Sequence, residues 1–316
     1  MTQAPVSIFS HASDAAARVS TLAWFMIGVS AVIFVGVMIA MVAAVMRNRR
    51  QDALGVDLRD RGLGWIVWGG TVMPALVLIA VFVVSLGAMS KFSPADPTAL
   101  TIHVTGHQWW WQVDYAPTHG TPAFRTANEI HIPVGQPVRV ILTTADVIHS
   151  FWVPQLQGKL DLIPGDTNVL RLQATRVGVF GGECAEYCGK QHAHMMLNVV
   201  SESDDQFTAW AANQARDAQP STDSTISAGH TLFTTTACVQ CHTVRGTPAR
   251  GELGPDLTHV ASRRTIAAGI APTTLATIAG WIGNPQALKP GANMPTLRSY
   301  TGPQLRALAA YVESLK

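Results

Sequence analysis

The stretch Cys-Ala-Glu-Tyr-Cys-Gly-Lys-Gln-His-Ala-His-Met, residues 184–195, places two thiols, an imidazole and a thioether within one short segment. Such a soft set of ligands favours copper over magnesium or calcium, which prefer oxygen ligands. A closed tetrahedral zinc site is an alternative, with His149 or His192 completing the shell, but it would leave Met195 unused. A pair of buried structural thiols, Cys184 and Cys188, is a second alternative.

This segment resembles the dinuclear copper (CuA) site of cytochrome c oxidase subunit II, with its pattern Cys-x-Glu-x-Cys-x-x-x-His-x-x-Met and a distant upstream His. The matching positions are His149, Cys184, Glu186, Cys188, His192 and Met195. The resemblance implies that both thiolates bridge two copper ions and that each imidazole binds one of them. It also implies a weak bond from the Met sulfur and one from the Glu186 carbonyl. The Glu186 side chain would reach a magnesium ion shared with subunit I, and His194 would lie outside the ligand set.

Two apolar runs dominate the first third of the chain. Of the 316 residues, 48% are hydrophobic and 13% charged, which indicates a membrane contribution. Residues 21–46 and 63–90 carry no charge, and each is longer than the roughly 20 residues that a membrane-spanning helix needs. We expect residues 1–20 to form an external tail. A signal peptide is the alternative for the first run, but its apolar core would be shorter, about 7–15 residues.

Basic residues separate the two apolar runs. The connecting segment 47–62 contains Arg47, Arg49, Arg50, Arg59 and Arg61. Because an excess of cations marks the cytoplasmic side, this loop is predicted to be cytoplasmic and both termini external. This predicts a chain anchored in a lipid bilayer, the bacterial inner membrane. The net charge of +2 gives no reason to expect a nucleic-acid partner.

Residues 91–202 form a region of short β-rich runs, including 101–105, 138–143 and 196–200. Pro and Gly turns separate these runs, as in a β-sandwich or a small barrel. The candidate metal ligands lie at the ends of such runs, where a Greek-key fold brings distant residues to one rim. The resemblance accordingly implies an all-β, cupredoxin-like domain.

An aromatic cluster, Gly-His-Gln-Trp-Trp-Trp, occupies residues 106–111. A strand whose tryptophans fill the core is one interpretation, and we expect it for Trp111. The cluster also resembles the Gly-His-Gln-Trp-aromatic-Trp segment of the subunit II family. That resemblance implies that Trp109 lies near the copper and admits electrons. Residues 158–165 resemble a family segment that faces the catalytic subunit, although a solvated turn explains them equally well.

A helix and a polar linker, residues 203–224, lead to a last domain, residues 225–316. Residues 238–242 read Cys-Val-Gln-Cys-His, the attachment motif of a c-type haem, in which Cys238 and Cys241 bind the vinyl groups and His242 ligates the iron. A thioredoxin-like redox pair is the alternative. No strand-helix-strand pattern surrounds the motif, however, and the adjacent His would be unexplained.

Met294 is the expected sixth ligand of the haem iron, because residues 225–316 contain no other methionine. His259 is the alternative axial ligand. The segment 225–316 resembles a class I cytochrome c, an all-α fold with an opening helix before Cys238 and a closing helix over 302–315. The whole chain is therefore expected to be multidomain, with a two-helix transmembrane hairpin, a cupredoxin-like Greek-key domain and a cytochrome c domain.

Together these resemblances imply subunit II of a caa-type cytochrome c oxidase, with both redox domains on the periplasmic side. Electrons would pass from an external cytochrome c, or an equivalent donor, to the haem c and the copper pair. They would continue to subunit I, whose haem and CuB reduce oxygen with proton pumping; subunit III is a further expected partner. A Glu near the start of the second span serves a proton channel in many relatives, but residues 63–68 contain no acid and the nearest is Asp60.

Three other functions compete with this interpretation. A subunit of a copper-containing nitric oxide reductase could use the same electron path, and the sequence does not exclude it. A membrane-anchored copper-binding or assembly protein must exchange its metal readily, which fits poorly with a full two-copper ligand set beside a covalent haem. A quinol oxidase subunit II is disfavoured because that branch lacks the copper ligands found here.

Overall fold

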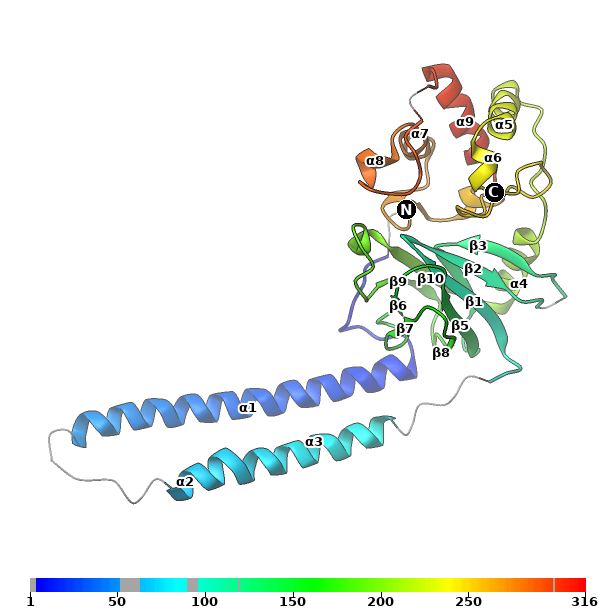
Figure 1. Cartoon of the computed structure of the whole chain (residues 1–316). Helices are drawn as coiled ribbons and strands as arrows, with labels where there is room; N and C mark the ends of the chain where they lie inside the picture. The colour runs from blue at the N-terminus through cyan, green and yellow to red at the C-terminus, as the bar shows by residue number, and fades with distance from the viewer. Residues whose placement is uncertain (1–3, 52–62, 90–95, 119, 298) are drawn as a thin grey trace. The chain divides into compact units, whose positions relative to one another are not determined.

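A computed structural model describes residues 4–51, 63–89, 96–118, 120–297 and 299–316 (Figure 1). The chain divides into two units, one comprising Met1–Ala16 and Pro94–Lys316 and the other Ala17–Ser93. The predicted order of apolar helices, β domain and helical domain is confirmed.

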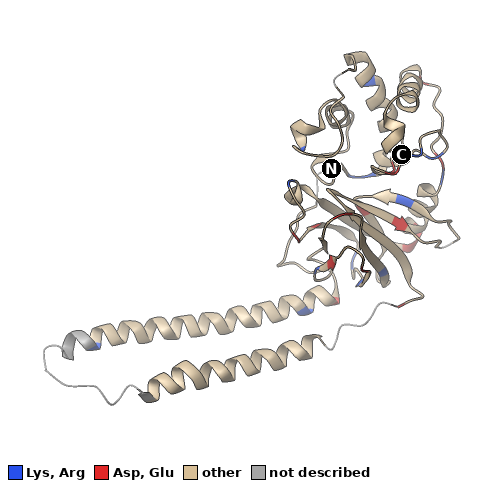
Figure 2. Ribbon diagram, in the orientation of Figure 1, with Lys and Arg blue, Asp and Glu red and all other residues tan. Residues whose placement is uncertain are grey.

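The apolar segments form long helices. Their bounds are Asp14–Gln51 for α1, Leu63–Val67 for α2, Trp68–Val72 for the π-helical turn η1, and Met73–Met89 for α3. Two stretches of 34 and 26 residues are long and apolar enough to cross a membrane, and neither is buried against protein. Figure 2 shows these helices almost free of charged residues along their length. The segment 52–62, with Arg59, Asp60 and Arg61, lies outside the described residues, so the orientation stays a prediction from sequence.

The segment before the first apolar helix was expected to form a tail, but it packs on the β domain. Helix α1 begins at Asp14, not at Thr21, and the residues before it pack on the β domain. The backbone N–H of Ala4 donates to the side chain of Asn198 at 3.1 Å, and the N–H of Ala12 donates to the carbonyl of Gln155 at 2.8 Å.

Two five-stranded sheets make up the β domain. The first has the order β3-β2-β1-β5-β8 and the second β4-β10-β9-β6-β7. In the first sheet the strands are β1 (Leu100–His107), β2 (Trp110–Tyr115), β3 (Phe124–Ala127), β5 (Val138–Thr144) and β8 (Asn168–Leu172). In the second they are β4 (Glu129–Pro133), β6 (His149–Trp152), β7 (Leu160–Leu162), β9 (Gly178–Cys184) and β10 (Met196–Glu202). The pairs β1–β5 and β4–β10 are parallel, and the others are antiparallel.

The alternation of buried residues explains why these strands pack as a sandwich. In β5, Val138, Val140 and Leu142 are fully buried while the residues between them are partly exposed, the period of a strand with one face in the core. Strand β4 is buried throughout, because α4 (Asp204–Gln214) covers part of the domain beside it. The two sheets thus enclose one apolar core that includes Cys184, Cys188 and Met195.

The last domain is helical. Its elements are α5 (Ser224–Thr235), α6 (Cys238–Cys241), η3 (Val260–Ser262), β11 (Thr265–Ile266), β12 (Ala271–Pro272), α7 (Leu275–Gly283), α8 (Pro285–Leu288) and α9 (Gly302–Ser314). Helices α5 and α9 pack together most closely at Gly229, where any Cβ would overlap the carbonyl of Ala307. A glycine is required there because the two backbones touch.

Candidate functional site

The sulfur-rich loop and His149 meet because two strands of the second sheet are paired. His149 begins β6, and Cys184 ends β9, which lies beside β6 with Phe151 opposite Cys184. Gly106, at the end of β1, leaves room for the imidazole. A Cβ at this position would lie 2.7 Å from Cδ2 of His149.

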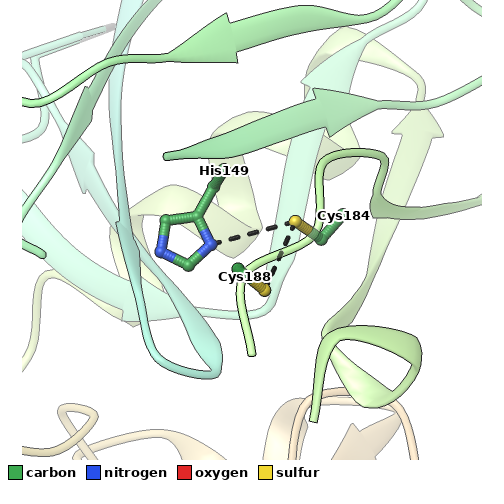
Figure 3. Close-up of side chains that lie close together, drawn as sticks. All are labelled: His149, Cys184 and Cys188. Carbon is green, nitrogen blue, oxygen red and sulfur yellow. Dashed lines mark hydrogen bonds between the residues drawn. The ribbon is translucent and has the colours of Figure 1, made fainter. Parts of the chain in front are cut away.

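Figure 3 shows the centre of this cluster, in which Nδ1 of His149 and the Sγ atoms of Cys184 and Cys188 face one another. The His149 Nδ1 to Cys184 Sγ distance is 3.8 Å, as is the distance between the two Sγ atoms. These three ligand atoms lie within 4.8 Å of one another, and all three side chains are buried. A nitrogen and two sulfurs around one small space can hold a soft metal.

Two further potential ligand atoms lie beside the Cys188 sulfur. Nδ1 of His192 lies 3.7 Å from Cys188 Sγ, and Sδ of the fully buried Met195 lies 3.9 Å from it. The carbonyl oxygen of Glu186 faces Cys184, 3.2 Å from its Sγ. All six positions suggested by the sequence therefore converge, whereas His194 turns away and bonds Gln191 at 2.6 Å.

The electrostatics of the cluster favour a thiolate. The hydrogen bond between the two thiols lowers the pKa of Cys184 to about 3, and the same hydrogen bond, together with burial, raises the pKa of Cys188. Burial lowers the pKa of His149, but its contacts with Cys184 and Asp146 raise it on balance. Nε2 of His149 donates a hydrogen bond to the Asp146 carboxylate at 2.8 Å. This bond leaves Nδ1 without a proton and directed at the two sulfurs.

Trp109 lies against the same loop. Its indole Nε1 donates to the carbonyl of Cys188 at 2.9 Å, and Nε2 of Gln108 donates to that carbonyl at 2.8 Å. Trp111 is fully buried, as its core interpretation requires, but it also packs edge-on against His149 with ring centroids 6.0 Å apart. The aromatic segment is thus in direct contact with the ligand cluster.

A second site is a cavity of about 460 Å³ in the helical domain. Its lining includes the four residues expected to hold a haem, Cys238, Cys241, His242 and Met294. Its remaining wall is largely apolar, but Trp109, with its neighbours Gln108 and Trp110, also lines it. Trp109 and Gln108 therefore both border the cavity and donate hydrogen bonds to the loop that contains Cys188.

The imidazole of His242 is prepared to bind a metal through one nitrogen. Its Nδ1 donates to the carbonyl of Pro255 at 2.8 Å, which leaves the Nε2 lone pair free. A Cβ on Gly254 would lie 2.7 Å from His242 Cε1, so this position must stay a glycine. The alternative axial residue, His259, is not part of the cavity wall, and its ring nitrogens contact the carbonyls of Lys316 and Arg216.

The sequence analysis did not identify the roles of three further residues. Asp146 orients His149, Gly106 makes room for it, and Lys289, in the helical domain, donates to the Trp109 carbonyl at 2.7 Å. None of the three belongs to a ligand motif. Only their position in the fold gives them a role.

Two family descriptions match the chain in its two redox regions. "Cytochrome C oxidase subunit II, periplasmic domain" matches residues 121–202, and "Cytochrome c" matches residues 226–316. Cytochrome c oxidase subunit 2 of Alkalihalophilus pseudofirmus is 34% identical over 294 residues, 91% of this chain and 83% of that protein. The chain belongs to the cytochrome c oxidase subunit 2 family.

A second relative and one solved structure are also similar to this chain. The protein from Bacillus sp. (strain PS3) is 32% identical over 270 residues, 79% of this chain and 74% of its own length. The solved periplasmic domain of subunit II of cytochrome oxidase from Bradyrhizobium japonicum is 36% identical, covers 37% of this chain and 95% of that structure, and has a TM-score of 0.35.

Membership in this family settles the general character of the chain. It is a membrane-anchored subunit of a haem-copper oxidase, with a copper-binding β-sandwich and a haem-binding cytochrome c domain, and subunit I is its partner. The expected fold class is confirmed as well, because a cupredoxin-like sandwich follows the two apolar helices and precedes the helical cytochrome c domain.

Proposed function

We propose that this oxidase subunit holds a dinuclear copper centre and one covalent haem c, and that Trp109 links the two sites. The observation that carries the proposal is the double contact of Trp109, which lines the haem cavity and donates a 2.9 Å hydrogen bond to Cys188. When bound, the haem and the copper pair each supply reversible one-electron oxidation and reduction. The protein's part is to hold both groups rigidly and to connect them.

The ligand atoms fit two copper ions better than one zinc. The His149 imidazole and the Glu186 carbonyl lie beside the Cys184 sulfur. The His192 imidazole and the Met195 sulfur lie beside the Cys188 sulfur. A single tetrahedral zinc would need only four of these atoms and would leave a buried thioether without a purpose. Burial of both thiols also keeps water from the centre.

The cytochrome domain fits a haem with one imidazole and one thioether ligand. His242 and Met294 both line the cavity, and the Nδ1 bond to Pro255 directs Nε2 of His242 towards it. Thioether–imidazole ligation raises the potential of a haem, which suits a role in electron transfer.

We further propose a magnesium site at the Glu186 side chain, shared with subunit I. This side chain is 45% exposed, and its carboxylate lies 3.8 Å from Lys159 Nζ. Lys159 belongs to the segment 158–165, which resembles a family segment that faces the catalytic subunit, so this segment and Glu186 are neighbours. Manganese substituted for magnesium would report the site by electron paramagnetic resonance, and Glu186→Gln should remove that signal. An unchanged signal would contradict the assignment.

We also propose further partners for the subunit and an orientation of its redox domains in the membrane. An external cytochrome c or equivalent donor would reduce the haem c, subunit III would complete the complex, and both redox domains would face the periplasm across the inner membrane. Labelling of single cysteines from outside intact cells would test the orientation. A cysteine in the segment 52–62 should stay unlabelled, whereas one at the exposed Glu252 should react.

Metal and haem analysis tests the central proposal most simply. The full-length subunit, purified without subunit I, should contain two copper ions for each covalent haem. One zinc, or one copper, per haem would overturn it. The complete complex should consume oxygen with reduced cytochrome c, and reduction of nitric oxide in place of oxygen would favour the reductase alternative.

A further inference from the structure

Lys289 belongs to the cytochrome domain, and its buried ammonium group faces the copper loop, residues 184–195. Only 3% of the residue is exposed, and Nζ donates to three backbone carbonyls, those of Trp109 and His194 at 2.7 Å and that of Ala267 at 3.3 Å. An ammonium group has three N–H donors, so each of them has an acceptor.

Simple core packing does not explain a lysine at this position. Burial lowers the pKa of Lys289 to about 7, although the charge of nearby Cys188 opposes this shift, and the three carbonyls accept hydrogen bonds from its N–H groups. Within the described part of the chain, no carboxylate forms an ion pair with it. An apolar residue would avoid the cost of desolvating a charge. The side chain is therefore best understood through the three segments that it joins.

Those segments are the ones that matter for electron transfer. Trp109 bonds the backbone of Cys188, and His194 lies between the proposed copper ligands His192 and Met195. Lys289 itself lines the haem cavity and precedes Met294 by one short loop. One ammonium group thus holds the backbone of the copper loop, the aromatic segment and the haem domain together.

Neighbouring contacts reinforce the same interface. Nδ2 of Asn293 donates to the carbonyl of Gln108 at 2.8 Å, and Nε2 of Gln191 donates to the carbonyl of Pro290 at 2.5 Å. The two domains also carry opposite net charge. Residues 96–223 contain 13 acidic and seven basic residues, whereas residues 225–316 contain three acidic and eight basic ones. Attraction between the domains favours docking, but only the short hydrogen bonds fix its geometry.

We propose that Lys289 is a positioning residue that locks the cytochrome domain onto the copper loop and holds the haem cavity against Trp109. The inference rests on the proposed function, because it assigns Lys289 a role between the two redox sites. Without its ammonium group, the haem domain would still fold and bind haem but would spend much of its time detached from Trp109.

The test is Lys289→Met in the full-length subunit, with Lys316→Met as a control. Lys316 is an exposed lysine of the same domain, so the control removes the same charge. In Lys289→Met, transfer from haem to copper should slow about tenfold, the effect of losing a buried hydrogen-bond network. Amide hydrogen exchange in residues 104–112 and 190–196 should rise. The optical and paramagnetic spectra of the two centres should be unchanged, as should both readouts in Lys316→Met.

A purely structural role for Lys289 predicts a different pattern. The haem domain would then lose thermal stability, but the transfer rate and amide exchange of the folded protein would match the wild type, and this result overturns the proposal. Equal effects of Lys316→Met and Lys289→Met would overturn it too, because charge alone would then be responsible.

If the Lys289→Met protein does not fold well enough to be purified, a milder substitution provides the test. Lys289→Gln keeps two N–H donors, and we expect a transfer rate between those of the wild type and the Met variant, with a smaller rise in exchange. Wild-type behaviour of the Gln variant in both readouts would overturn the proposal. A wild-type subunit without two copper ions or without covalent haem would instead refute the proposed function, so the two failures are distinguishable.

Discussion

The indole nitrogen of Trp109 donates a 2.9 Å hydrogen bond to the carbonyl oxygen of Cys188, while the same residue forms part of the haem cavity wall. A glycine at position 189 makes this approach possible. Its φ of +113° is one that glycine adopts readily, and a Cβ there would lie 3.1 Å from Cζ2 of Trp109. The aromatic segment and the copper loop therefore form one connected structure.

Trp109→Phe should separate the electronic role of this residue from a structural one. Phenylalanine keeps a ring beside the cavity but cannot donate to Cys188. We expect an unchanged copper spectrum, severalfold slower transfer from haem to copper, and nearly unchanged transfer to subunit I. Flash-induced transfer measured for each step checks this. Trp111→Phe is the matched control: a smaller buried ring leaves a cavity and should lower stability with little effect on the first step. An intact haem-to-copper rate in Trp109→Phe would contradict the assignment.

Gly106→Ala should disturb the copper site although residue 106 is no ligand. The added methyl group would lie 2.7 Å from Cδ2 of His149, and the imidazole must move to relieve the overlap. Such overpacking costs about 1–3 kcal/mol, so copper binding should weaken by roughly tenfold or more. Copper titration of the apoprotein measures it. Gly158→Ala, where a Cβ meets nothing within 4 Å, should bind copper normally, and equal affinities of the two variants would refute the steric account.

Met294→Ala should leave the haem attached but change its iron. The thiols of Cys238 and Cys241 still anchor the group, whereas loss of the thioether lowers the potential and opens the iron to carbon monoxide. Optical titration with carbon monoxide and a redox titration check both effects. A low-spin spectrum that keeps the thioether charge-transfer band would show that another residue is the ligand.

His131 should make the β domain less stable at alkaline pH. Burial lowers the pKa of His131, but its hydrogen bonds to Glu129 and Glu202 raise the pKa above the ordinary value on balance. Because the folded-state pKa is raised, this stabilisation is complete below about pH 6.5 and is lost as the pH rises through the folded-state value. Urea unfolding of wild type and His131→Gln should therefore converge at high pH and differ most near pH 6. A constant difference between the two would contradict this.

The metal and haem ligands could be predicted from sequence because most of them lie within two short motifs. Cys184 and Met195 share one loop, and His242 directly follows the helical turn Cys238–Cys241, so spacing alone indicates the chemistry. His149 and Met294 lie outside these motifs: His149 precedes Cys184 by 35 positions, and Met294 follows His242 by 52. The family resemblance implied that His149 is a copper ligand, and the pairing of β6 with β9 explains its place beside Cys184.

Features that depend on contact between distant segments could not be predicted. Lys289 reads as one basic residue in a Pro- and Gly-rich loop, and nothing local shows that its ammonium meets Trp109, 180 residues away. The N-terminal segment likewise reads as a polar tail. Its pairing with the β domain depends on Gly181, where a Cβ would overlap the carbonyl of Ala4, and this requirement is invisible without the fold.

The copper pair is the centre of this account, and the paramagnetic spectrum of Cys184→Ser and Cys188→Ser tests it most directly. Two thiols 3.8 Å apart, each with its own imidazole, are needed to bridge two ions. The wild-type subunit should show the seven-line signal of an electron shared by two copper ions, and each variant should lose it and keep at most one copper. A seven-line spectrum that persists in either variant would contradict the dinuclear site.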